Sequence, residues 1–181
     1  SKLAAAGKRP KTSQNKDRIG ESWEISGLEG SESVVSDGEY RGMSLRELIR
    51  LKGESLVGKR SIERFGDEFP ILVKFIAAHE DLSIQVHPST PLAKELHNSH
   101  GKSEMWYVVD AAPGSKVYVG FNRDMTAQEL YDRCHDGTVA ETLNVICPKK
   151  GDVIFMKPGT VHAAEGGLLV VEIQESSDMT F

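Results

Sequence analysis

The sequence predicts a mainly β protein of the sandwich or barrel type with a few short helices. Its apolar residues come in bursts of strand length, and turn signals such as Ala112-Pro113-Gly114 and Lys150-Gly151-Asp152 separate these bursts. Helices and strands do not alternate along the chain as they do in a doubly wound fold. Many short strands joined by glycine and proline turns are typical of sandwiches and barrels.

The individual elements follow from the same patterns. Helices are expected after Ser44, where Glu47 completes a capping box, over residues 91–97 behind the cap residue Thr90, and after Thr126. Strands are expected at residues 71–77, 82–86, 105–109, 117–121, 143–146, 153–156 and 168–173. The strands outnumber the helices, which favours a β core with helices at its periphery.

Composition limits the domain organisation and the partners. The chain has 181 residues, 39% hydrophobic and 27% charged, which suits one globular domain over residues 20–181 behind a basic, flexible N-terminal arm or loop over residues 1–19. A net charge of -5 argues against nucleic acid or an anionic membrane as a partner, although a few local cations can still hold a small anionic substrate. Two cysteines without disulfide or zinc-finger spacing, and no run typical of a signal peptide or membrane span, predict a cytoplasmic protein. The sequence leaves the oligomeric state open.

Three separate segments carry residues that bind metal ions. Gln85 and His87 alternate with aliphatic residues, so a strand there turns both to one face, and Glu104 and His162 lie further along the chain. Two imidazoles, a carboxylate and a weak amide ligand suit a borderline divalent ion such as zinc and leave room for a water or substrate oxygen. Two simpler interpretations stay open on these residues alone: a polar alternation on an exposed strand, and a hairpin whose histidine covers the core.

The spacing of Gly151, Gly159 and His162 resembles the second cupin motif, with Pro158 one place later than the usual proline. Turns at Gly151 and at Pro158-Gly159 would return the histidine toward a barrel interior. The first cupin motif is only partly met, over residues 85–104. The resemblance implies a cupin-type jelly-roll β-barrel.

The chain also resembles the type I phosphomannose isomerases, the zinc-dependent mannose-6-phosphate isomerase family of the cupin superfamily. The segments that carry this resemblance span most of the chain from Gly20 onward: residues 21–26, 82–88, 101–107, 158–163 and 172–178. It implies one zinc ion with the ligands Gln85, His87, Glu104 and His162. It further implies the catalytic residues Lys102, Glu172 and Asp178 and the substrate-binding residues Ser83 and Lys102.

Two departures from the family pattern concern the ends of the chain. Members normally have a Trp-Gly-Gly segment ahead of the equivalent of Ser1 and an arginine just after the equivalent of Phe181, and this chain has neither. The domain is therefore expected to be incomplete at both ends relative to the family, which puts the activity of this chain in question.

The function implied by the resemblance is zinc-dependent aldose–ketose isomerisation of a small phosphosugar, between mannose 6-phosphate and fructose 6-phosphate, through an enediol. Such a site polarises a carbonyl with the metal and moves a proton with a carboxylate or amine whose pKa lies near neutral. One alternative is a non-catalytic sugar-phosphate-binding cupin that keeps the metal site. A further alternative is a non-haem iron oxygenase of the cupin class, since two histidines and one carboxylate can form a facial triad. Gln85 as a fourth ligand argues against the oxygenase.

Overall fold

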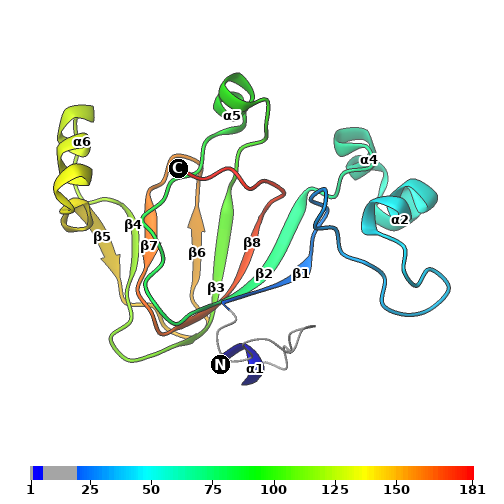
Figure 1. Ribbon diagram of the computed structural model, residues 1–181, viewed down its shortest axis with the longest axis horizontal. Coiled ribbons are helices and arrows are strands. Elements are labelled where there is room, and N and C mark those ends of the chain that lie inside the picture. The colour runs from blue at the N-terminus through cyan, green and yellow to red at the C-terminus, as the bar shows by residue number, and fades with distance from the viewer. Residues whose placement is uncertain (1, 6–19) are drawn as a thin grey trace.

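Two antiparallel sheets form the fold of residues 2–5 and 20–181, which are the residues described by this computed structural model (Figure 1). The larger sheet has the strand order β1-β2-β8-β3-β6, and the smaller has the order β5-β4-β7. The strands are β1 Glu21–Ile25, β2 Ile71–Ala78, β3 Glu104–Ala111, β4 Val117–Phe121, β5 Leu143–Ile146, β6 Val153–Met156, β7 His162–Ala164 and β8 Leu168–Glu175. The expected mainly β jelly-roll architecture is confirmed; within the described residues its strands pair as two sheets and do not close into one continuous barrel.

All of the expected strands are present except residues 82–86, where the prediction is wrong. This segment makes an isolated bridge from Gln85 to His162, and the adjacent Val86 pairs instead with Phe181. Because neighbouring residues bond to different partners, no ladder of consecutive pairs forms. The sequence patterns did not indicate β1, which is largely polar, or β7, which has only three residues.

The helices lie at the periphery of the sheets (Figure 1). They are α1 Lys2–Ala5, α2 Leu45–Lys52, α3 Glu54–Val57, α4 Lys59–Phe65, α5 Thr90–His97, α6 Ala127–Asp136 and the 3₁₀ turn η1 Val139–Thr142. The three expected helices are confirmed as α2, α5 and α6, and the capping box of Ser44 and Glu47 is present. The cap of α5 is Ser89 rather than Thr90, whose hydroxyl accepts a hydrogen bond from the Gly101 N–H. No helix in the described part of the chain is both long and apolar enough to span a membrane.

The inward face of the larger sheet changes from apolar to polar along its strands. Its apolar end packs against the smaller sheet in a core of Ile76, Ala78, Trp106, Val108, Val117, Ile154, Met156, Ala164, Leu168 and Val170. Toward the other end, alternate positions that share this face bear Lys74, Glu104 and Glu172, which are also buried. The strands therefore place charged side chains at one end of an apolar core.

The N-terminal helix α1 packs on the outer face of the larger sheet. Leu3 is 1% exposed and packs with Ala77 and Leu169. The Lys2 ammonium donates hydrogen bonds to Asp110 Oδ2 at 2.6 Å and to the Gly167 carbonyl at 2.7 Å. Residues 6–19, most of the expected flexible arm, lie outside the described residues, so the prediction for them stays a prediction.

Candidate metal centre

His87, Glu104 and His162 come together from three segments, as the sequence suggested. Their ligand atoms all lie within 4.8 Å of one another. The three side chains are almost fully buried, with exposed fractions of 3% for His87, 2% for Glu104 and 0% for His162. Neither of the simpler interpretations survives: His87 does not lie on an exposed strand, and His162 faces two other metal-binding side chains.

Backbone contacts hold the three segments in place. Gln85 and His162 exchange two N–H···O hydrogen bonds of 2.9 Å, and the Gly159 N–H donates to the His87 carbonyl at 2.8 Å. Gly159 has a positive φ of 82°, which suits glycine and makes the expected turn before His162.

The loop before Glu104 approaches the His87 segment just as closely. The Lys102 N–H donates to the Pro88 carbonyl at 3.1 Å. A Cβ at Gly101 would lie only 2.3 Å from the Thr90 nitrogen, so any larger residue would push this loop away. Glycine at this position therefore allows Lys102 and Glu104 to reach the histidines.

Both histidines are oriented by backbone carbonyls. His87 Nδ1 lies 3.0 Å from the Met179 carbonyl, and His162 Nδ1 lies 2.9 Å from the Thr160 carbonyl. A carbonyl only accepts hydrogen bonds, so each Nδ1 carries a proton, and in the neutral imidazole each Nε2 then presents a lone pair to the interior. This is the arrangement in which histidines bind metal ions.

The imidazole nitrogens and carboxylate oxygens that point into the cluster face one another with too few hydrogen-bond donors to pair them all. His162 Nε2 lies 2.9 Å from Glu104 Oε1, and His87 Nε2 lies 3.2 Å from Glu104 Oε2. Both Glu104 oxygens and His162 Nε2 are buried without a partner in hydrogen-bonding geometry. Buried polar atoms are rarely left unpaired, and a cation among them would satisfy all three. The ligand atoms of His87, Glu104 and His162 therefore fit a divalent metal ion.

Electrostatic interactions favour the ionised form of the Glu104 carboxylate, which is the form that binds cations. Burial would raise the pKa of Glu104, but the imidazoles of His162 and His87 and the ammonium of Lys102 outweigh it and hold the pKa well below its ordinary value. Glu104 is therefore ionised at neutral pH. Lys102 Nζ lies 2.9 Å from Glu104 Oε2 and 3.3 Å from His87 Nε2, so a positive charge already stands beside the cluster.

Gln85, the fourth expected ligand, lies next to His162 through their backbone bridge. Its side chain is half-buried. Its role as a ligand stays a prediction.

Lys102 and Glu172 connect the cluster to a second pair of charges. Glu172 Oε1 lies 3.7 Å from Lys102 Nζ and 3.1 Å from Lys74 Nζ, and Glu172 Oε2 accepts a hydrogen bond from Trp106 Nε1 at 2.8 Å. Burial would lower the pKa of Lys74, but the carboxylates of Glu172 and Glu21 outweigh it and raise this pKa. Two lysines and one carboxylate thus lie beside the candidate metal centre.

Sequence reasoning missed Lys74, although a signal for it existed. Residues 71–77 form the expected apolar strand, and period-two alternation puts Lys74 on the same face as Leu72 and Ile76. A lysine on the inward face of an apolar strand is rare unless it is paired. The position of Lys74 in the strand therefore indicates a buried carboxylate partner.

The remaining expected site residues lie at the surface. Ser83 is exposed in the segment between β2 and α5. Asp178 is exposed and lines a separate hollow of about 350 Å³ with Arg46 and His100. The roles predicted for Ser83 and Asp178 stay predictions.

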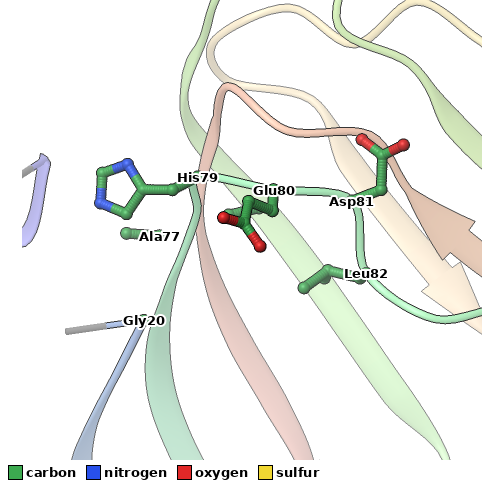
Figure 2. A pocket seen from close by; sticks show the side chains of 7 residues that line it. Gly20, Ala77, His79, Glu80, Asp81 and Leu82 are labelled. Atoms are coloured by element: carbon green, nitrogen blue, oxygen red, sulfur yellow. The ribbon is translucent and has the colours of Figure 1, made fainter. Parts of the chain in front are cut away.

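A further hollow of about 460 Å³ lies at the apolar end of the larger sheet, lined by Gly20 and residues 77–82 (Figure 2). Ala78 follows Lys74 by four residues, about 13 Å along an extended strand. None of the expected site residues lines this hollow, so the candidate site is at the other end of the strands.

Known proteins of one family are similar to this chain in sequence. The model of the family "phosphomannose isomerase type I, catalytic domain" matches residues 2–108, which include His87 and Glu104. Mannose-6-phosphate isomerase ManA of Bacillus subtilis is 36% identical over 165 residues, covering 91% of this chain and 50% of that protein. Mannose-6-phosphate isomerase of Streptococcus mutans is 35% identical over 165 residues, with the same coverage of 91% and 50%.

A solved structure adds the three-dimensional likeness. The crystal structure of mannose 6-phosphate isomerase from Bacillus subtilis has a TM-score of 0.80 and 34% sequence identity, and the match covers 90% of this chain and 50% of that one. The chain thus spans about half the length of these relatives. With its family model, close relatives and fold in agreement, the chain belongs to the type I phosphomannose isomerase family.

Proposed function

We propose that the chain is a zinc-dependent aldose–ketose isomerase that interconverts mannose 6-phosphate and fructose 6-phosphate through an enediol. The observation that carries this proposal is the cluster of His87, Glu104 and His162, whose buried lone pairs converge beside charged side chains. The relatives named as mannose-6-phosphate isomerases support the choice of substrate.

His87, Glu104 and His162 would hold the ion, with Gln85 as a weak fourth ligand. Nitrogen and oxygen ligands of this kind suit a borderline divalent ion such as zinc. When bound, the ion supplies Lewis acidity toward the sugar's carbonyl and hydroxyl oxygens. The Nδ1 hydrogen bonds to Thr160 and Met179 keep both imidazoles in the binding tautomer.

The proton must move between C1 and C2 of the sugar, and Glu172 is the best-placed carboxylate. It is 3% exposed, Trp106 donates a hydrogen bond to its Oε2, and its Oε1 lies between the ammonium groups of Lys74 at 3.1 Å and Lys102 at 3.7 Å. Lys102 Nζ is close enough to both Glu104 and Glu172 to stabilise negative charge that develops on the substrate. Asp178 is exposed and contributes to a different hollow, so we rank it behind Glu172 as the base.

The test is a coupled assay for fructose 6-phosphate formed from mannose 6-phosphate, run in parallel in deuterated water. Turnover with solvent deuterium at the carbon that gains the proton supports an enediol, because its proton exchanges with solvent through the base. Turnover that leaves the product free of deuterium even under slow, metal-limited conditions, in which the base has time to exchange, would favour a direct hydride shift over the enediol.

The same samples separate the alternatives. Bound zinc with phosphosugar binding but no turnover would identify a non-catalytic binding protein. Bound iron with oxygen-dependent chemistry would identify an oxygenase. Either result would overturn the proposed isomerase.

A further inference from the structure

Trp23 occupies a position that the proposed chemistry leaves without a role. It pairs with Lys74 across β1 and β2, Lys74 pairs with Glu172, and Glu172 pairs with Trp106. Directly paired residues on neighbouring strands point to the same face of a sheet. The four side chains therefore form one row on the inward face, with Trp106 buried at one end and Trp23 at the open edge formed by β1 (Figure 1).

The Trp23 indole is fixed by a hydrogen bond and a nearby charge, yet part of it remains exposed to solvent. Its Nε1 donates a hydrogen bond to Glu21 Oε2 at 2.9 Å, and Lys74 Nζ lies 5.8 Å from the ring centroid. Glu21 Oε2 lies 3.7 Å from the same Lys74 ammonium, so the indole is bound into the charged row. Yet 38% of the residue remains exposed. The pairing register also shifts immediately after Trp23, an irregularity that re-aims side chains and often lies beside active sites.

An exposed aromatic ring with its polar atom already satisfied offers only its apolar faces to a ligand. Binding pockets for small molecules typically combine such faces with a few fixed polar groups. Here the polar groups are the charges of Lys74 and Glu172, one and two strands away. A strand spacing of about 4.8 Å puts Trp23 roughly 10 Å from Glu172, comparable to the length of an extended six-carbon phosphosugar.

We propose that Trp23 forms the aromatic wall of the phosphosugar site and contacts the C–H face of the sugar while the neighbouring charged groups bind its oxygens. This inference rests on the proposed isomerase function. It assigns a substrate-binding role to the Glu21–Trp23 segment, which the resemblance singled out without giving it a task.

The test compares Trp23→Leu and Trp23→Phe with the control Tyr131→Leu, an exposed aromatic (65%) on α6. Loss of the ring in Trp23→Leu should weaken fructose 6-phosphate binding about tenfold by calorimetry and raise KM in parallel, with kcat changed by less than about threefold. Trp23→Phe keeps an aromatic face and should bind within about threefold of the wild type. Metal content and the thermal midpoint should match the wild type in all three variants, which separates lost contact from lost folding.

A second measurement needs no variant. Trp23 and Trp106 are the two tryptophans of the chain, and Trp106 is 1% exposed, so acrylamide quenching reports mainly on Trp23. Saturating fructose 6-phosphate should protect the indole from acrylamide. If the sugar binds by calorimetry but neither protects Trp23 nor binds more weakly to Trp23→Leu, the aromatic wall is wrong and the isomerase proposal stands. If the wild type neither binds nor converts fructose 6-phosphate, both proposals fail.

Discussion

Replacing His162 by alanine tests the metal centre where its geometry is most demanding. The residue is 0% exposed, its Nε2 has no hydrogen-bond partner, and its Nδ1 is fixed by Thr160. Structural zinc sites with four ligands bind with about 10–16 kcal/mol, so one ligand of four contributes roughly 2.5–4 kcal/mol. His162→Ala should therefore weaken zinc binding on the order of 100- to 1,000-fold.

The assay is a competition titration of zinc against a chromophoric chelator, with circular dichroism as a check on folding. His135→Ala is the matched control, because His135 lies exposed on α6 and should leave zinc affinity unchanged. The cluster found among the described residues has no further histidine, cysteine or carboxylate to replace His162. Stoichiometric zinc at wild-type affinity in a folded His162→Ala variant would refute the assignment.

Three further predictions concern two residues beside the metal centre and one on the outer face of the larger sheet. Lys102→Ala should keep zinc but lower turnover at least tenfold, because Lys102 Nζ lies 2.9 Å from Glu104 Oε2; unchanged kinetics in the coupled assay would remove it from the site. Gln85→Ala should weaken zinc about tenfold in the same titration, since it removes the weak ligand, and no change would leave three protein ligands. Leu3→Ala should reduce the free energy of unfolding in urea by about 2 kcal/mol. The exposed control Leu96→Ala should lose less than about 0.5 kcal/mol, and equal losses would show that α1 does not stabilise the sheet.

Local patterns predicted much of the fold because the strands are short apolar segments between turns. Residues 117–121, 143–146 and 153–156 were placed with the bounds of β4, β5 and β6. The prediction of a strand at residues 82–86 is wrong because an apolar alternation does not specify a pairing partner. The backbone hydrogen bonds of this segment are divided between β7, at His162 and Ala164, and Phe181. Strand pairing is a property of the tertiary structure, which a local window does not contain.

The site was predictable to the extent that its residues bind metal ions by type. His87, Glu104 and His162 were each recognisable, and their convergence is confirmed. Lys74 and Trp23 were not singled out, because their importance depends on the register that aligns β1, β2 and β8 in one row. The backbone carbonyls that orient the two imidazoles leave no trace in the sequence, since any residue can supply a carbonyl.

Metal content and turnover, measured on the same sample, test the central claim most directly. The protein would be stripped with a chelator, titrated with zinc, and assayed at each step for conversion of mannose 6-phosphate to fructose 6-phosphate. We predict that turnover is absent without metal and returns in proportion to bound zinc, reaching its maximum at one ion per chain. Full turnover in the metal-free protein, or bound zinc without any turnover, would contradict the account.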